Sequence, residues 1–586
     1  MRSIPIKRYL TLLGTYLKPQ WLKALLLALV LLVGTVLQLI NPQLVRYFID
    51  TISVHGDVRT LVNTGLLYVG VAVVNQGVAI VTSYLSTNVA WTATNQLRVD
   101  LVKHCLALDM SFHKAHTAGE MIERIDGDVD DLSNFFSQFV LSLLTNALLL
   151  VGILFLFFTI SWIVGLAMTA FSLLVFLALL YMRRYITQFW KAERQMSAVF
   201  YGFLGERLGG TEDIRANGAT ASIMRRFYLL LREWFPIRRR AVMASNFAAA
   251  FTLFMFVCGS ALALLLGTYL WSLKQISIGT VYLLFAYTDL LSQPTQQIQA
   301  QLQDLQQAEA CIQRTEEILK ISSKLADNGT EPFPIEARDK SVLVEFKDVT
   351  FGYSEDEPVI QNLTFTIQPG RILGIVGRTG GGKTTIARLL FRLYDPQSGE
   401  IRIGGIATQK VPLHELRQHI GMVTQDVQLF HASVRDNLTF FTSTIHDEHI
   451  LAAIDEVGLT KWYKSLPDGL DTVLGSDGEG LSAGEAQLLA FTRVLLTQPG
   501  LVILDEASAR LDPATEGIIE KAIGRLFAQR TAIVIAHRLA TIQRVDDILI
   551  IEDGQAVEYG RREELMRDAH SRFAGILRVG LEEMRV

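Results

Sequence analysis

Long runs of apolar residues dominate the first half of the chain. The cleanest is LKALLLALVLLVGTVLQLI at residues 22–40. About 20 apolar residues in a helix are enough to cross the roughly 30 Å hydrocarbon core of a bilayer. We therefore expect six transmembrane helices, over residues 21–41, 61–86, 136–160, 161–183, 245–271 and 276–298.

The connections between these spans indicate their orientation. The third and fourth spans meet around Ser161-Trp162, which predicts a tight hairpin, whereas the connections after spans two and four are long and polar. Positive residues mark the cytoplasmic side of a membrane. We therefore expect the arginine-rich connection after span four, and both chain termini, to be cytoplasmic. The start of the chain shows no cleavable signal, and its positive residues are Arg2, Lys7, Arg8 and Lys18.

The last span runs into a glutamine-rich stretch at 295–319. Its residues Ile298, Leu302 and Leu305 recur at helical spacing, which predicts an amphipathic helix that continues the span. In an alternative reading, some of the glutamines line a polar translocation path. Residues 321–341 are polar, contain two prolines and are typical of a linker.

From Val342 onwards the hydrophobic pattern changes. Short β-rich runs (VLVEF, ILGIVG, LVILDE, TAIVIAH and ILIIED) alternate with helical stretches, which predicts an α/β domain with a largely parallel sheet. We therefore expect a multidomain chain with an all-α transmembrane domain at 1–320, the linker at 321–341 and an α/β domain at 342–586.

Composition agrees with membrane spans and excludes other classes. Hydrophobic residues make up 50% of the 586 and charged residues 19%, which is too apolar for a soluble enzyme of this length. The net charge of -4 gives no general basic character for binding nucleic acid. The three cysteines, Cys105, Cys258 and Cys311, lack metal-ligand or redox spacing, so we interpret them as buried small apolar residues.

Two motifs in the second half carry the chemistry. GRTGGGKTT at 377–385 is a phosphate-binding loop, in which backbone N–H groups close around phosphates, Lys383 adds a point charge and the Thr384 hydroxyl ligates Mg²⁺. LVILDE at 501–506 is an apolar strand ending in two carboxylates. Hydrolysis needs one carboxylate for Mg²⁺, here Asp505, and one to orient and deprotonate water, here Glu506.

With these motifs in order, the second half resembles the nucleotide-binding domain of ABC transporters. The resemblance of the whole chain to this family runs from about residue 6 to the end. It implies that Tyr353 stacks on adenine, that Gln425 ligates Mg²⁺, and that His537 contacts the γ-phosphate. The site residues implied by the motifs and the resemblance are catalytic Glu506, His537 and Gln425; nucleotide-binding Tyr353, Gly377, Arg378, Thr379, Gly380, Gly381, Gly382, Lys383, Thr384, Thr385, Ser482, Gly484 and Asp512; and Mg²⁺-binding Thr384, Gln425 and Asp505.

The first half resembles the six-helix exporters of that family. TAGEMIERIDGDVDDL at 117–132 and ERLGGTEDIRANGA at 206–219 match family segments that include or adjoin coupling helices, which dock on a nucleotide-binding domain. The resemblance implies ATP-driven export of hydrophobic or amphipathic substrates across a bacterial plasma membrane by alternating access. A lipid flippase and a peptide exporter are built from the same parts and stay as alternatives.

Two function classes of a different kind are less favoured. One is a nucleotide-gated regulatory membrane protein with little turnover, against which the intact Glu506 argues. The other is a soluble ABC-type ATPase that acts in DNA repair or translation, against which the apolar spans argue. Asp289 lies in the sixth span, where an ionisable residue is a functional candidate, or else lies near the cytoplasmic end and is merely solvated.

The signature motif departs from the family pattern. The usual LSGGQ reads LSAGE at 481–485, so Ala483 adds a methyl group and Glu485 places a carboxylate where a phosphate is expected. An acidic residue of the family pattern is Ser476 here. Because one chain holds a single membrane half and a single nucleotide half, a second chain is needed. An intact Glu506 beside an altered signature favours a heterodimer over a homodimer.

Overall fold

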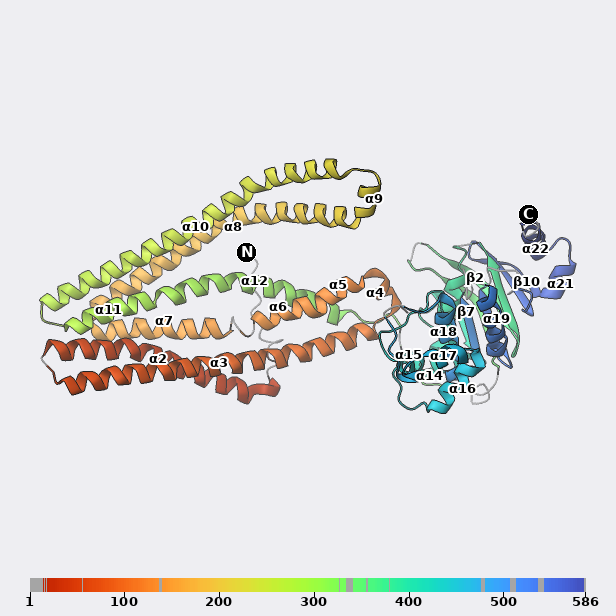
Figure 1. Cartoon of the computed structure of the whole chain (residues 1–586), viewed down its shortest axis with the longest axis horizontal. Coiled ribbons are helices and arrows are strands. Elements are labelled where there is room, and N and C mark those ends of the chain that lie inside the picture. Colours follow the sequence, from red (N-terminus) through yellow and green to blue (C-terminus); the bar gives the residue numbers. More distant parts are fainter. Residues whose placement is uncertain are drawn as a thin grey trace. The chain divides into compact units, whose positions relative to one another are not determined.

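The chain forms two compact units in a computed structural model (Figure 1). One unit, here the helical unit, comprises Met1–Leu106 and Ala118–Ile321, and the other, the α/β unit, comprises Ala107–Thr117 and Ser322–Val586. The structure describes residues 14, 16, 18–54, 56–135, 137, 140–325, 327–333, 341–354, 357–378, 380–475, 480–505, 513–535 and 542–583.

The helical unit is built from long helices with short ones between them. The six predicted spans fall on helices except at Ser161, Ile276, Ser277 and Leu291, and residues 136, 138 and 139 lie outside the described residues. Only Ser161 separates the third from the fourth, so the predicted hairpin is confirmed. The elements are α2 (Trp21–Ser53), α3 (Val58–Ala107), α5 (Ala118–Ile122), α6 (Asp128–Asn134), α7 (Val140–Ile160), α8 (Trp162–Gly209), α9 (Thr211–Ala216), α10 (Thr220–Ser272), α11 (Ile278–Leu290) and α12 (Ser292–Lys320).

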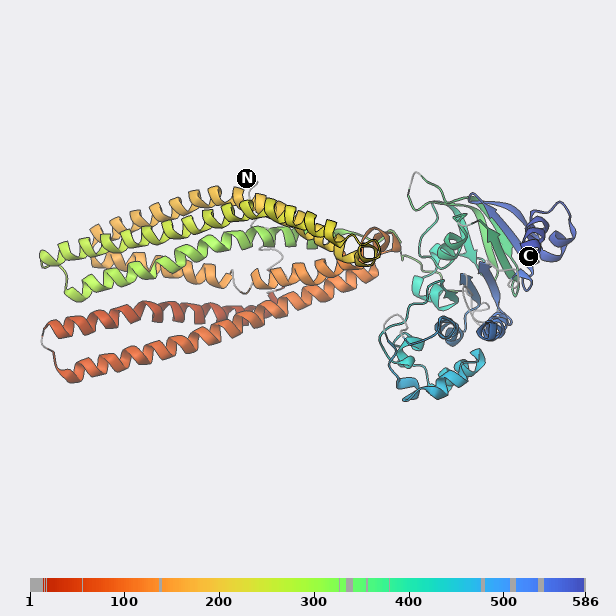
Figure 2. The same ribbon diagram turned by 45° about the horizontal axis from the view of Figure 1, so that its top comes forward.

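Several of these helices are much longer than the spans predicted for them. The helices α3, α8 and α10 contain 50, 48 and 53 residues. At 1.5 Å per residue each is roughly 70–80 Å long, more than twice the thickness of the hydrocarbon core. They therefore continue well beyond the apolar segment, and α8 and α10 run side by side in both views (Figures 1 and 2).

Apolarity marks the parts of these helices that suit a bilayer. The helices over Lys18–Ser53, Val58–Ala107, Trp162–Gly209 and Thr220–Ser272 are long and apolar enough to cross a membrane, and Leu144–Ile160 and Ile278–Leu290 are shorter apolar helices. The sixth span is interrupted at Leu291, where α11 gives way to α12. Burial of Cys105 and Cys311 is confirmed, but Cys258 on α10 is exposed, because an apolar side chain on a membrane helix need not face the protein.

A buried tyrosine links the first and sixth spans. The Tyr287 side chain on α11 is fully buried, and its hydroxyl donates to the Leu39 carbonyl at 3.0 Å and accepts from the Gln43 amide at 2.9 Å. The Phe157 ring packs edge-on against it, with centroids 6.1 Å apart. Because a buried hydroxyl costs free energy unless it is paired, this network fixes the register of α2 against α11.

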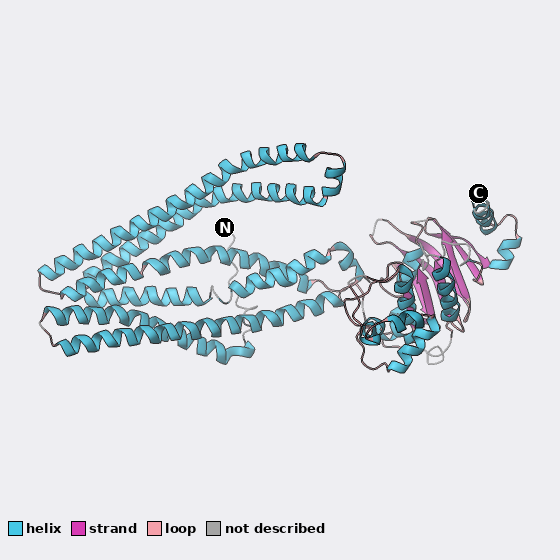
Figure 3. Ribbon diagram, in the orientation of Figure 1, coloured by secondary structure: helices cyan, strands magenta, loops and turns pink. Residues whose placement is uncertain are grey.

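A six-stranded, mostly parallel sheet forms the core of the α/β unit, as the pattern predicted (Figure 3). Its order is β10-β9-β3-β8-β7-β6, and only the β9–β10 pair is antiparallel. The strands are β3 (Ile372–Gly377), β6 (Ile420–Val423), β7 (Leu501–Asp505), β8 (Thr531–Ile535), β9 (Asp547–Glu552) and β10 (Gln555–Arg561).

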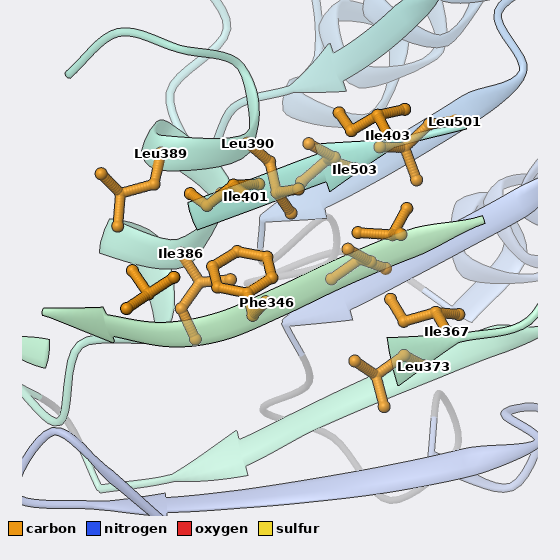
Figure 4. Packing of buried hydrophobic residues seen from close by; sticks show 14 of the residues in the cluster. Phe346, Ile367, Leu373, Ile386, Leu389, Leu390, Ile401, Ile403, Leu501 and Ile503 are labelled. Atoms are coloured by element: carbon orange, nitrogen blue, oxygen red, sulfur yellow. The ribbon is translucent and has the colours of Figure 1, made fainter. Parts of the chain in front are cut away.

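A second, antiparallel sheet was not predicted. Its order is β2-β1-β4-β5, formed by β1 (Val344–Phe351), β2 (Ile360–Ile367), β4 (Ser398–Ile403) and β5 (Ile406–Ala407). Its inner face packs on the parallel sheet and on helix α13 (Lys383–Leu390), as Figure 4 shows for Phe346, Ile386 and Ile503. This packing holds the start of α13 between the two sheets.

Candidate nucleotide site

The phosphate-binding loop joins β3 to α13, and its glycines are required by its geometry. Gly380 and Gly382 adopt φ angles of +86° and +97°, which disfavour other residues. A Cβ on Gly377 would lie 2.2 Å from the Ile551 carbonyl oxygen, and one on Gly382 would lie 2.5 Å from the Ile360 side chain. The backbone therefore curves tightly into the N-terminus of α13, which is a general site for anions.

The lysine of this loop is buried and lies over the turn. The Lys383 side chain donates from Nζ to the carbonyl oxygens of Gly377 at 2.8 Å and Arg378 at 2.9 Å. Gly381 N–H donates to the Arg378 carbonyl at 3.1 Å, which closes the turn. Thr384 is half-buried at the start of α13 and Thr385 is buried. The loop thus gathers backbone donors and one ammonium group, which suits a polyphosphate.

Predicted residues from three strands share one edge of the parallel sheet. Asp505 ends β7 and is buried, Gln425 follows β6 at an exposed position, and the phosphate loop follows β3. Through β8, Asp505 lies in register with Ile375, just before the loop. Carboxyl ends of parallel strands are where such folds bind ligands. The carboxylate and side-chain oxygens gathered there are the ligands that Mg²⁺ prefers.

The aromatic residue at the predicted adenine position is firmly held. The Tyr353 hydroxyl lies 3.2 Å from Thr385 Oγ1 and accepts from Arg388 Nη1 at 3.0 Å. The rings of Phe351 and Tyr394 each meet the Tyr353 ring edge-on, with centroids 5.2 Å away. The ring is therefore tied to the helix that follows the phosphate loop. Arg388 was not among the predicted site residues, although its position on α13, the helix that follows the phosphate loop, could have indicated it.

A lysine from the first half of the chain also reaches this tyrosine. Helix α4 (Met110–Ala115) belongs to the α/β unit, and its Lys114 ammonium lies 4.1 Å from the centroid of the Tyr353 ring. A cation at this distance is attracted to the ring face. Nothing in the sequence around Lys114 pointed to this contact, because the two residues lie far apart in the chain.

Asp109 fixes α4 on the α/β unit. Its carboxylate accepts from the Ser111 backbone N–H at 2.8 Å and from the Lys324 backbone N–H at 2.6 Å. Burial acts to raise the pKa of Asp109, but hydrogen bonds from these N–H groups, the Ser111 hydroxyl and Phe112 N–H together lower it below its ordinary value. A predicted coupling segment, 117–132, therefore adjoins a short helix that is anchored on this unit, whereas α9, in the segment 206–219, belongs to the helical unit.

The altered signature motif begins helix α18 (Ala483–Thr497). Ser482 is its N-cap, and the Ser482 hydroxyl accepts from Glu485 N–H at 3.2 Å. In return the Glu485 carboxylate accepts from the Ser482 backbone N–H and from its hydroxyl, both at 2.8 Å. This reciprocal arrangement is a capping box, and it occupies both donors of Ser482. Gly484 is buried in the first turn.

Four predicted site residues lie outside the described residues: Thr379, Glu506, Asp512 and His537. Their roles stay predictions. Asp289, the ionisable residue of the sixth span, is exposed one residue before the end of α11.

Family comparisons agree with this architecture. Residues 24–295 match the family described as ABC transporter transmembrane region, and residues 360–509 match the family described as ABC transporter. A bacterial Atm1-family ABC exporter with ATP bound has the same fold, with a TM-score of 0.78 over 96% of this chain and 98% of its own, at 24% identity.

Curated relatives align along most of the chain. The probable multidrug resistance ABC transporter ATP-binding/permease protein YheH of Bacillus subtilis is 31% identical over 80% of this chain and 70% of its own. The fatty acid ABC transporter ATP-binding/permease protein of Mycobacterium bovis is 30% identical, covering 80% and 74%. The ATP-dependent lipid A-core flippase of Alcanivorax borkumensis is 28% identical, covering 94% of both. With a helical membrane domain fused to a phosphate-binding α/β unit, the chain belongs to the ABC transporter family as an exporter-type half-transporter.

Proposed function

We propose that this half-transporter exports hydrophobic or amphipathic compounds across a bacterial plasma membrane, with both termini in the cytoplasm. The chain is a multi-pass membrane protein with an ATP-binding ABC domain, and hydrolysis of ATP drives its transport. One observation supports the proposal: the α/β unit has a phosphate loop between β3 and α13, and the other unit of the same chain has helices long and apolar enough to cross a membrane. Relatives named for multidrug resistance, fatty acid and lipid A-core support apolar or amphipathic substrates.

The site residues divide the chemistry of hydrolysis among them. The loop glycines and Lys383 hold the β- and γ-phosphates, and Tyr353 stacks on adenine. Thr384, Gln425 and Asp505 would hold Mg²⁺, which offsets negative charge that develops on the phosphates. Glu506 orients and deprotonates the attacking water, and His537 contacts the γ-phosphate.

ABC exporters function as dimers, and we propose that the partner of this chain is a different half-transporter. In the family, the signature motif of one chain completes the ATP site of the other. Here the Glu485 carboxylate takes both donors of Ser482. A γ-phosphate that approached Ser482 would have to displace a carboxylate and would be repelled by its charge. The helix N-terminus stabilises that carboxylate where it is. The partner's ATP site should therefore turn over slowly.

Purification from native membranes without a tag on any partner tests this assignment. We expect a second half-transporter with an intact LSGGQ motif to co-purify. In that complex Glu506→Gln should abolish nearly all ATPase activity, whereas the double change Ala483→Gly with Glu485→Gln should alter it little if the partner lacks its own base. A homodimer of this chain with full, substrate-stimulated activity would show the heterodimer to be wrong and leave ATP-driven export in place.

Lipid transport is the closest competing function, because two relatives carry names of lipid substrates. Movement of a fluorescent phospholipid between leaflets of proteoliposomes, dependent on ATP and lost in Glu506→Gln, would favour a flippase. Efflux of amphipathic dyes without lipid movement would favour the compound exporter.

A further inference from the structure

A polar cavity lies within the helical unit, among residues of a single chain. It has a volume of about 500 Å³ and is lined by α2, α3 and the residues around the start of α7. Pockets of roughly 300–1,000 Å³ are typical of small-molecule sites. The cavity is therefore large enough for the head and upper chain of an amphipathic molecule.

The lining is polar but carries no charge among its described residues. Threonine, serine, asparagine and glutamine make up most of it, and leucine, glycine, valine and alanine complete it. On α3 the lining residues recur every three or four positions and therefore lie on one face, with the apolar Val78 and Ala79 between the polar Asn75 and Thr82. On α2 the lining runs from Leu31 through Thr35 to Gln38 with the same spacing.

Several of these hydroxyl groups offer acceptors rather than donors. The Thr35 hydroxyl donates to the Leu31 carbonyl at 2.9 Å, and the Ser86 hydroxyl donates to the Ser137 carbonyl at 2.8 Å. The Ser137 hydroxyl donates to the Asn134 carbonyl at 3.3 Å. Each oxygen keeps lone pairs that a ligand hydroxyl or amide N–H can use.

The position of the cavity suits entry from the cytoplasmic side. Thr35 lies 14 residues into α2, roughly 20 Å from its predicted cytoplasmic end, and Asn75 lies 17 residues, roughly 25 Å, from the opposite end of α3. The lining thus extends from near mid-membrane towards the cytoplasmic side of the orientation proposed above. Placing an unpaired charge among these residues would cost far more than placing a hydroxyl or an amide.

We propose that this cavity binds the uncharged, hydrogen-bond-donating head group of an amphipathic substrate, such as a polyol ester or an amide. The inference rests on the proposed function, since it names the substrate class of the exporter. A second cavity of about 500 Å³ has the opposite character, because Arg46, Asp50 and Lys274 line it. A charged head group would find counter-charges there and none among the described lining of the first cavity.

The test compares matched 12-carbon amphiphiles on the full transporter, with any co-purifying partner, in proteoliposomes. Monododecanoylglycerol is uncharged, dodecyltrimethylammonium is cationic and dodecyl phosphate is anionic. We expect monododecanoylglycerol to stimulate the ATPase at the lowest concentration. Thr82→Val and Asn75→Leu should each raise its half-stimulating concentration about fivefold, the effect of one lost hydrogen bond. Thr64→Val, a buried threonine on the same helix outside the cavity, should leave it unchanged.

Four results would overturn the inference in different ways. Stimulation by a charged amphiphile at equal or lower concentration would refute the substrate class and leave export intact. Stimulation by the glyceride that is indifferent to Thr82→Val and Asn75→Leu would place the ligand elsewhere. If the variants instead dissociate the dimer, the polar face packs against a second chain. No response to any of the three amphiphiles, with basal ATPase intact, would count against amphiphile export itself.

Discussion

Replacing Tyr353 tests how the α/β unit holds the base of its nucleotide. The rings of Phe351 and Tyr394 pack nearly perpendicular to the Tyr353 ring, the Lys114 ammonium lies over that ring, and the Tyr353 hydroxyl contacts Thr385 and accepts from Arg388. Tyr353→Ala removes the whole stacking face. Tyr353→Phe removes only the hydroxyl and leaves a ring that its neighbours still support. The two variants therefore separate stacking from hydrogen bonding.

The expected effects differ in size. Stacking of a base on an aromatic ring is worth about 1–3 kcal/mol by alanine substitution. Since 1.4 kcal/mol is a factor of ten, Tyr353→Ala should raise the Kd for ATP by roughly 5–150-fold. The bonds of the hydroxyl lie within the protein, and each is worth about 0.5–1.5 kcal/mol, mostly to folding rather than binding. Tyr353→Phe should therefore raise the Kd by less than about tenfold.

Equilibrium titration with a fluorescent ATP analogue, in competition with ATP, measures both variants on the full chain. Carrying both in the Glu506→Gln background keeps the nucleotide intact during the titration. Unchanged affinity in Tyr353→Ala would mean that the ring only packs. Equal losses in the alanine and phenylalanine variants would mean that the hydroxyl network, and not the ring face, controls binding.

Three further predictions concern hydrolysis and the supports of each unit. Glu506→Gln should keep ATP binding but reduce ATPase turnover strongly, measured by phosphate release; turnover like that of the parent would refute its role as the base. Arg314, whose side chain is 43% exposed, pairs through two nitrogen atoms with Asp128, whose side chain is 5% exposed, so Arg314→Met should lower the free energy of unfolding by about 1.5–3 kcal/mol, since it removes charged hydrogen bonds from a buried carboxylate. Lys320→Met, which breaks an exposed pair on the same helix, should cost less than about 1 kcal/mol, and equal thermal shifts for the two would contradict this. Because the pKa of Asp109 is lowered in the folded state, its ionised carboxylate stabilises the fold at pH values above its ordinary pKa of 3.8. This contribution should be lost as the pH falls below 3.8, and Asp109→Asn should abolish that part of the acid sensitivity in thermal melts.

Local patterns were sufficient for the membrane helices and for five strands of the α/β unit, namely β1, β3, β7, β8 and β9. The run LVILD became the fully buried β7, because only a strand covered on both faces tolerates continuous apolar residues. The same parallel arrangement explains why residues far apart in sequence lie at one edge of the sheet, where Gly377 and Asp505 end their strands and Gln425 follows β6. The order of motifs carried that information, since parallel strands with crossovers return the chain to the same side.

Contacts that depend on tertiary packing left no trace in the local pattern. The antiparallel sheet was missed because strands such as β2 mix polar and apolar residues, and what buries them is another sheet. The cation over Tyr353 was missed because Lys114 is an ordinary exposed lysine on a short helix. The sequence predicted only that the Glu485 carboxylate would repel a phosphate. The structure adds that this carboxylate accepts both hydrogen bonds that Ser482 can donate, so a phosphate would compete with it for them.

The place of α4 has a consequence for how this protein is made. Asp109 leaves the ribosome 215 residues before Lys324, its partner in the α/β unit. At synthesis rates of about 5–20 residues per second, the wait is on the order of 10–40 s, during which α4 lacks the α/β unit to which it belongs. Folding of the second half therefore completes a piece of the first. A fragment that starts at residue 322 would lack a helix that belongs to its own fold, so we expect the addition of residues 107–117 as a separate peptide to raise its melting temperature.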